Sequence, residues 1–97
     1  MQTITPEEIK QRLANGEELH IIDVREPEEI ALGMIPGAKS IPLMQIPERL
    51  ADIPQLGETI LVCRSGNRSS RAYEYLEAQG LKGLKNMTGG MLEWESL

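Results

Sequence analysis

Short apolar runs recur along the chain and are separated by more polar segments. LHIIDV (19–24) and TILVC (59–63) are almost continuously apolar, which is typical of strands covered on both faces of a sheet. AKSIP (38–42), which proline ends, and GLKNM (83–87) indicate two further strands. The hydrophobic pattern therefore predicts four short strands, of which TILVC gives the clearest signal.

The segments between these runs carry helix signals. Thr5, Pro6 and Glu8 form a capping-box start with proline at the first helical position, and Gly16 supplies a stop. These signals predict a helix over 6–15. Shorter helical segments are expected at three further places, namely 27–32, 44–53 and the C-terminal GGMLEWESL.

The segment that follows TILVC predicts a second full helix. SSRAYEYLEAQG covers residues 69–80 and ends on a glycine, a common residue just past the end of a helix. The side of this helix that faces the core is expected to consist of Ala72, Tyr75, Leu76 and Gln79.

Strands that alternate with helices over short connections predict an α/β fold, in which helices cover both faces of a parallel sheet. A chain of 97 residues is of a size that fits one domain, so residues 1–97 are expected to fold together. In such sheets the functional site lies at the carboxyl ends of the strands. Cys63 is at one of those ends.

Composition and charge narrow the choice of partners. The chain is 40% hydrophobic and 26% charged, has no apolar stretch long enough for a membrane span, and begins without a signal-peptide pattern, so a cytoplasmic protein is expected. Its net charge of -5 argues against binding to nucleic acid. Residues 59–73, however, contain Arg64, Arg68 and Arg71 and no acidic residue, which favours a small anionic substrate.

Cys63 is the only cysteine, and two interpretations of it compete. It cannot form an internal disulfide or a cysteine-based zinc cluster, and a lone cysteine that closes an apolar strand is often a small core residue. The stretch RSGNR after it favours a reactive thiol instead, because Gly66 and Asn67 tolerate the positive φ angles of an amide cradle. The helix that begins near Ser69 adds its positive end, so the pKa of the thiol is expected to be low.

Three segments also resemble a known family. CRSGNRS (63–69), with the strand before it and the helix after it, resembles the active-site loop of rhodanese-like sulfurtransferases. DVREPEEIALGMIPGAKSIP (23–42) is similar to the family's first signature, and NMTGGMLEW (86–94) to its C-terminal one. The segments come in the family's order and spacing and, with the elements between them, span nearly the whole chain.

This resemblance implies a rhodanese-like domain with a five-stranded parallel sheet. It also implies a cycle in which Cys63 takes a sulfane sulfur from an anionic donor, such as thiosulfate or a persulfide, and passes it to a thiol or cyanide. A protein acceptor is a further candidate, and the chemistry requires neither a metal nor an organic cofactor. The residues implied to bind the persulfide and the donor are Arg64, Ser65, Gly66, Asn67, Arg68 and Ser69, with Arg64 and Arg68 on the donor's charge.

The first signature departs from the family pattern at two positions and contains two further candidates. Met34 stands where the family usually has histidine, and Ile30 where it has an aromatic residue, and both are interpreted as differences in packing. Asp23 and Arg25 lie at the end of a predicted strand and are candidates for supporting the loop of residues 63–69. The alternative for them is a purely structural ion pair, for example between Arg25 and Glu29.

Two other functions stay open at this point. Cell-cycle phosphatases and arsenate reductases also place a cysteine before an arginine, but with five residues between the two, where this chain has the four residues 64–67. The second alternative is a module that binds a partner or relays sulfur within a complex, without efficient turnover of free substrates.

Overall fold

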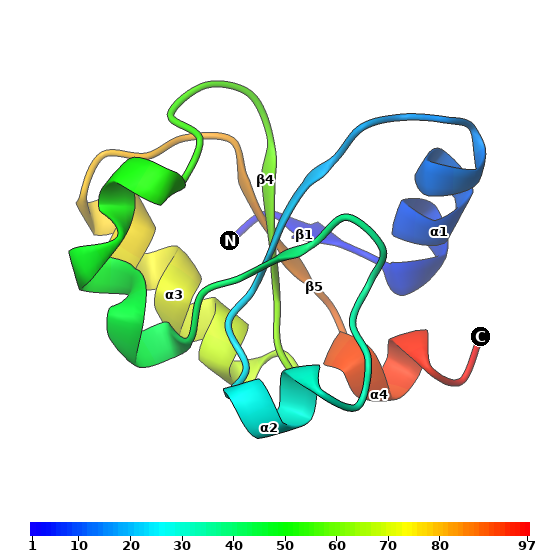
Figure 1. The fold of residues 1–97 in the computed structure, drawn as a ribbon. Coiled ribbons are helices and arrows are strands. Elements are labelled where there is room, and N and C mark those ends of the chain that lie inside the picture. Colours follow the sequence, from blue (N-terminus) through cyan, green and yellow to red (C-terminus); the bar gives the residue numbers. More distant parts are fainter.

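The computed structural model describes residues 1–97 and contains one sheet of five parallel strands (Figure 1). The strands are β1 (Thr3–Ile4), β2 (His20–Asp23), β3 (Lys39–Ser40), β4 (Thr59–Val62) and β5 (Leu84–Met87). Their order across the sheet is β1-β5-β4-β2-β3, and every neighbouring pair is parallel. The predicted α/β fold with a five-stranded parallel sheet is confirmed.

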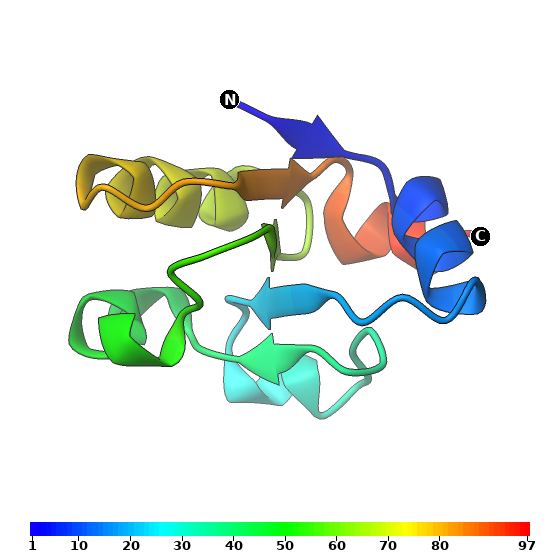
Figure 2. The ribbon, with the colours of Figure 1, turned by 90° about the horizontal axis from the view of Figure 1, so that it is seen from above.

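Helices cover both faces of this sheet, as Figure 2 shows from above. One face carries α1 (Pro6–Ala14) and α4 (Gly90–Trp94), and the other carries α3 (Asn67–Ala78) with two short 3₁₀ helices, η1 (Leu43–Glu48) and η2 (Leu50–Asp52). The short helix α2 (Pro27–Ile30) follows β2. None of the helices has the length and apolar character needed to cross a membrane.

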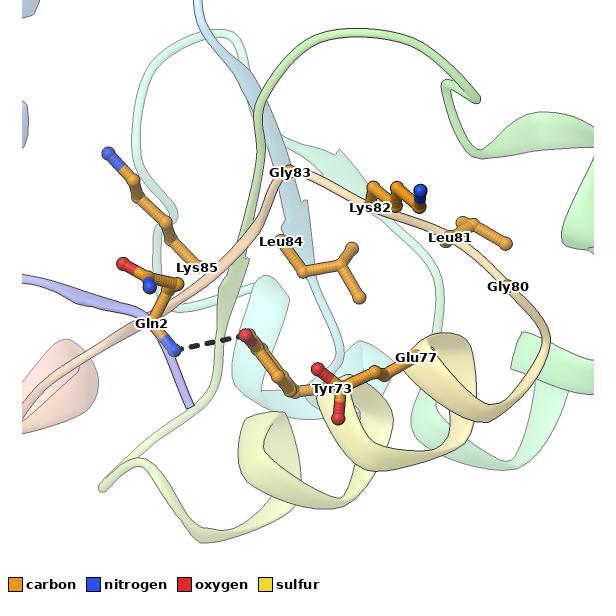
Figure 3. A pocket seen from close by; sticks show the side chains of 9 residues that line it. All are labelled: Gln2, Tyr73, Glu77, Gly80, Leu81, Lys82, Gly83, Leu84 and Lys85. Atoms are coloured by element: carbon orange, nitrogen blue, oxygen red, sulfur yellow. Dashed lines mark hydrogen bonds between the residues drawn. The ribbon is translucent and has the colours of Figure 1, made fainter.

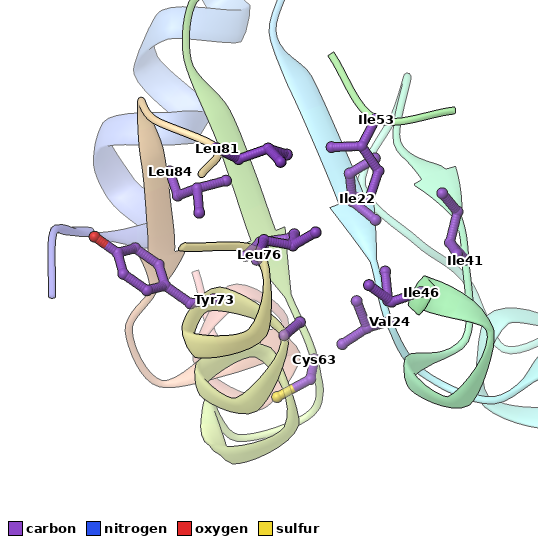
Figure 4. Close-up of a cluster of buried hydrophobic side chains, with 12 residues drawn as sticks. Ile22, Val24, Ile41, Ile46, Ile53, Cys63, Tyr73, Leu76, Leu81 and Leu84 are labelled. Atoms are coloured by element: carbon purple, nitrogen blue, oxygen red, sulfur yellow. The ribbon is translucent and has the colours of Figure 1, made fainter. Parts of the chain in front are cut away.

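The central strands bury side chains on both sides, which accounts for their continuous hydrophobicity. Alternate residues of β4 point to opposite faces, so Ile60 and Val62 join one core cluster while Leu61 joins the other. The cluster on the α3 side (Figure 4) consists of Ile22, Val24, Ile41, Ile46, Ile53, Leu61, Cys63, Ala72, Tyr73, Leu76, Leu81 and Leu84. The cluster on the α1 side consists of Ile4, Ile9, Ile21, Ile35, Ile60, Val62, Met87 and Met91.

The strand β1 has no counterpart among the four strands that the hydrophobic pattern predicts. It is two residues long, too short for a periodic signal, and it forms because the chain lies against β5. The amide of Asn86 donates to the carbonyl of Gln2 at 3.0 Å, and that of Thr88 to the carbonyl of Ile4 at 3.0 Å. Tertiary pairing, and not local sequence, therefore creates the fifth strand.

The helix α3 differs from its prediction at its start and on its inner side. It begins at Asn67, two residues before the predicted start, because Gly66 adopts a φ of +106° and acts as the N-cap. The predicted Gln79 is exposed, and Tyr73 is buried in its place. The hydroxyl of Tyr73 accepts a hydrogen bond from the amide of Gln2 at 3.0 Å, which satisfies its polar end within the core.

Candidate active site

Cys63 follows β4 directly, at the carboxyl edge of the sheet. Its side chain belongs to the core cluster on the α3 side and is only 1% exposed (Figure 4). The sulfur nevertheless has polar neighbours: the amide of Gly66 donates to Sγ at 3.0 Å, and the hydroxyl oxygen of Ser69 lies 3.3 Å from it. Cys63 is thus both a buried core residue and a thiol set among hydrogen-bond donors.

The turn from β4 into α3 creates this arrangement. The positive φ of Gly66 folds the chain back over the cysteine, so that the amide of Gly66 points at the sulfur. Because α3 begins at the next residue, the positive end of its dipole also lies beside Cys63. The segment 63–69, called the cysteine loop from here on, therefore gathers partial positive charge around one thiol.

The environment of Cys63 lowers the pKa of its thiol below the ordinary value. Burial of the thiol is the largest single effect and raises the pKa, because it disfavours the charged form. Hydrogen bonds to sulfur from the hydroxyl of Ser69 and from the amides of Ser69, Gly66 and Ser65 act in the opposite direction and together outweigh burial. A lowered thiol pKa increases the share of the nucleophilic thiolate at a given pH.

A network behind the sulfur fixes Ser69 and the loop carbonyl of Gly66. The hydroxyl of Ser69 lies 2.5 Å from Oδ1 of Asn86, and the side-chain amide of Asn86 donates to the hydroxyl of Ser70 at 2.9 Å and to the carbonyl of Gly66 at 3.3 Å. Asn86 is on β5 and was not among the expected site residues. The signal for it is a polar residue directly before the apolar Met87 in a short strand, and the side chain of Asn86 is indeed buried.

The helix α4 holds the other side of the cysteine loop. The amide of Met91 donates to the carbonyl of Cys63 at 2.9 Å, and the amide of Leu92 to the carbonyl of Arg64 at 3.0 Å. Gly90 makes this contact possible, since a Cβ atom there would collide with the carbonyl of Arg64 and the amide of Ser65. The C-terminal segment NMTGGMLEW thus reaches the site through backbone contacts.

Of the two arginines expected to bind the donor, one is in an ion pair and the other is not. The guanidinium of Arg68 is paired with the Glu29 carboxylate through two contacts, Nη1 to Oε1 at 2.6 Å and Nη2 to Oε2 at 2.8 Å. Arg64 is exposed and takes part in none of the ion pairs of the chain. Ser65 and Asn67 are exposed as well. Arg64 is therefore the cation of the cysteine loop that is free to meet an anion.

Asp23 and Arg25 form a buried ion pair with each other. Nη2 of Arg25 lies 2.9 Å from Oδ2 of Asp23, and the same guanidinium donates to the carbonyl of Gly33 at 2.8 Å. The ion pair suggested between Arg25 and Glu29 is wrong, because Arg25 reaches only the backbone carbonyl of Glu29, at 3.5 Å. A buried guanidinium needs close compensation, and Asp23 provides it. Together the pair fastens the segment around α2 to the end of β2.

One of the cavities on the molecule lies next to the cysteine loop. A cavity of about 230 Å³ adjoins the cysteine loop and is lined by Arg25, Glu29, Leu32, Arg64, Met91, Leu92 and Glu95. A larger cavity of about 560 Å³ lies near the amino end of β5 and the C-terminal end of α3, with Tyr73 and Leu84 on its wall (Figure 3). Because Cys63 is at the carboxyl edge of the sheet, only the smaller cavity belongs to the candidate site.

This geometry is suited to nucleophilic chemistry on a small anion. It combines a thiol with a lowered pKa, amide and hydroxyl donors at its sulfur, and a free cation at Arg64. Ile30 and Met34, at the positions where the first signature departs from its pattern, are half-buried. No group of three or more His, Cys, Asp or Glu side chains is arranged to hold a metal ion.

Comparison with known proteins gives concordant results. The family model of the rhodanese-like domain matches residues 5–97. A protein named sulfurtransferase from Allochromatium vinosum is 43% identical over 91 residues, which cover 94% of this chain and 85% of that protein. The putative sulfurtransferase YtwF of Bacillus subtilis is 42% identical over 95 residues, covering 98% of this chain and 91% of that protein.

The fold has a similar counterpart among solved structures. The crystal structure of a rhodanese-like domain protein from Staphylococcus aureus superposes with a TM-score of 0.91 at 41% identity, over 97% of this chain and 91% of that one. These relatives support sulfur transfer by a rhodanese-type transferase. Because the family model spans nearly the whole chain and these relatives match almost end to end, the chain belongs to the rhodanese-like family.

Proposed function

We propose that this protein is a sulfurtransferase that carries a sulfane sulfur as a persulfide on Cys63. The donor is thiosulfate or an organic persulfide, and the acceptor is a thiol, which includes the thiol of a protein, or cyanide in a test reaction. The observation that carries the proposal is the placement of the Cys63 sulfur, 3.0 Å from the amide of Gly66 and 3.3 Å from the hydroxyl of Ser69. The proposed setting is the cytoplasm, where a thiol stays reduced.

The first half-reaction loads sulfur onto the protein. The Cys63 thiolate attacks the outer sulfur of thiosulfate, a new S–S bond forms, and the bond to the sulfite group breaks. Sulfite leaves with the electron pair of that bond, and the negative charge of the thiolate passes to the terminal sulfur of the persulfide. We expect the amides and the hydroxyl around the Cys63 sulfur to stabilise this terminal sulfur when it turns toward them.

The second half-reaction unloads sulfur. An acceptor thiolate or cyanide attacks the terminal sulfur, and Cys63 leaves as the thiolate that began the cycle. Charge and electrons balance in both halves, so the cycle requires no external oxidant or reductant. Ping-pong kinetics are expected, because the first product leaves before the acceptor reacts.

Intact-protein mass spectrometry after incubation with thiosulfate tests the proposal. We expect the mass to increase by one sulfur atom, a reductant to remove it, and the folded variant Cys63→Ser to gain none. If folded wild-type protein gains no sulfur from thiosulfate or from an organic persulfide, the proposed function is wrong. Sulfur loading followed by transfer to protein thiols, with negligible turnover to cyanide, would identify the sulfur relay instead of the free enzyme.

A further inference from the structure

We propose that Glu29 determines which sulfur donors the protein accepts, by disfavouring small dianions such as thiosulfate relative to organic persulfides of low charge. The inference rests on the proposed function and adds a residue outside the cysteine loop that selects among its donors. It comes from an ion pair that occupies one of the two arginines expected to bind the donor.

The guanidinium of Arg68 already has an acidic partner. Both terminal nitrogens of its guanidinium contact the Glu29 carboxylate, at 2.6 and 2.8 Å. Such a two-contact pair uses the face of the guanidinium that would otherwise hold the oxygens of an anionic donor. A donor that needs Arg68 must therefore compete with a carboxylate that is already attached to the same chain.

Glu29 is also held in place by contacts that do not involve Arg68. Its Oε1 accepts a hydrogen bond from the amide of Glu26 at 3.1 Å, which closes the first turn of α2. Its backbone carbonyl accepts from Arg25, whose charge is itself balanced by Asp23. The carboxylate is thus held by its own helix as well as by Arg68, which restricts the side chain that forms the ion pair.

Charged side chains of both signs line the cavity beside the cysteine loop. Arg64 and Glu29 line this cavity together, and Glu95 adds a second carboxylate to its wall. A dianion that enters meets the free cation Arg64 and the carboxylate of Glu95, while Arg68 balances the charge of Glu29. The cavity therefore gives a dianion little net attraction, whereas a neutral or singly charged persulfide depends less on such attraction. The Glu29 carboxylate therefore acts against a dianion by neutralising Arg68, which leaves Arg64 as the free cation beside the thiol.

The experiment compares thiosulfate with the persulfide of 2-mercaptoethanol, generated in situ, as donors in single-turnover loading of Cys63. In the variant Glu29→Gln, the glutamine oxygen can still accept from the amide of Glu26, while the charge that holds Arg68 is gone. We expect the ratio of the second-order rate constant for loading by thiosulfate to that for loading by the organic persulfide to rise about tenfold, the effect of one freed charge-assisted contact. The matched control is Glu28→Gln, which removes an equal charge from an exposed position on the same helix.

The double variant Glu29→Gln with Arg68→Ala separates the freed arginine from a general loss of repulsion. If Arg68 is responsible, most of the gain disappears in the double variant. An unchanged donor ratio in folded Glu29→Gln, or an equal rise in Glu28→Gln, would overturn the assignment of Glu29. These results differ from failure of the proposed function, in which neither donor loads sulfur onto any of the proteins.

Discussion

The hydroxyl oxygen of Ser69 lies 3.3 Å from the sulfur of Cys63, although the two residues are six positions apart in the chain. The first turn of α3 folds back over the end of β4 and brings them together. The same hydroxyl lies 2.5 Å from Oδ1 of Asn86, so its position is fixed from the neighbouring strand. The hydroxyl has a single hydrogen, which can turn from Oδ1 of Asn86 to the sulfur when Cys63 ionises, and in that orientation it stabilises the thiolate.

Replacing Ser69 by alanine should therefore raise the pKa of the Cys63 thiol. With less thiolate present at neutral pH, we expect the rate of iodoacetamide alkylation at pH 7 to fall about tenfold, as for the loss of one hydrogen bond to a charged group. Ser65→Ala is the matched control, because it removes an exposed hydroxyl from the same loop. Equal pH profiles of alkylation for Ser69→Ala and the wild type would contradict the role of this hydroxyl.

The ion pair between Glu29 and Arg68 predicts a specific loss of stability in acid. The hydrogen bond from Arg68 is the largest of the effects that lower the pKa of Glu29 from 4.5 to about 2. A lowered pKa stabilises the fold fully above the unfolded value of 4.5, and this contribution is lost as the pH falls toward 2. Solvent screens this partly exposed pair, so we expect about 1 kcal/mol.

Urea unfolding of the wild type and Glu29→Gln between pH 7 and pH 2 measures this contribution. The difference in the free energy of unfolding between the two proteins should be largest near neutral pH and should shrink below about pH 4.5. Parallel curves over the whole range would show that the ion pair does not stabilise the folded chain.

A methyl group at Gly90 should disrupt the contact between α4 and the cysteine loop. The new Cβ would collide with the backbone of Arg64 and Ser65, and the φ of +58° at Gly90 is unfavourable for alanine. We expect Gly90→Ala to destabilise the protein by about 2 to 4 kcal/mol and to slow sulfur loading. Gly16→Ala is the control for backbone strain alone, since Gly16 has a φ of +84° and open space around it. Equal losses in the two variants would mean that the close approach to the loop is unimportant.

Arg64 should contribute more to the use of thiosulfate than Arg71, the other exposed arginine among residues 59–73. Arg64 is on the cysteine loop and has no acidic partner, so its replacement by alanine should lower kcat/KM for thiosulfate about tenfold to a hundredfold. Arg71→Ala, which removes an exposed arginine further along α3, should have a much smaller effect. A comparable loss in the second half-reaction with cyanide would indicate that Arg64 shapes the loop rather than binds the donor.

The length of the cysteine loop predicts that this protein transfers sulfur but does not act on phosphate esters or arsenate. Four residues lie between Cys63 and Arg68, one fewer than in the phosphatases, and a displacement of about 1 Å can lower a rate on the order of a hundredfold. We expect negligible hydrolysis of aryl phosphates and no reduction of arsenate where thiosulfate is used. Insertion of one glycine between Gly66 and Asn67 should lower sulfur transfer. Cys63-dependent hydrolysis of an aryl phosphate by the unmodified protein, at a matching rate, would contradict this.

Local sequence determines several elements of the fold and the position of the cysteine. The continuous hydrophobicity of LHIIDV and TILVC is a direct consequence of burial on both faces, so it identifies β2 and β4 without knowledge of their partners. The cap of α1 is a local signal too, since Thr5 accepts a hydrogen bond from the amide of Glu8 three residues later. The cysteine is equally local, because it directly follows the apolar run of β4. The α/β fold and the position of the cysteine loop could therefore be predicted.

Other features depend on which segments meet in space. The strand β1 exists because it pairs with β5, and Asn86 acts on the site because β5 lies beside β4. The pairing of Arg68 with Glu29 joins residues 39 positions apart, and no local pattern distinguishes an arginine held by a distant carboxylate from a free one. Hydrogen bonds and ion pairs act over a few ångströms between side chains that the fold brings together. The sequence alone therefore determined where the thiol lies, whereas the tertiary structure decided which groups surround it and which arginine is left for the donor.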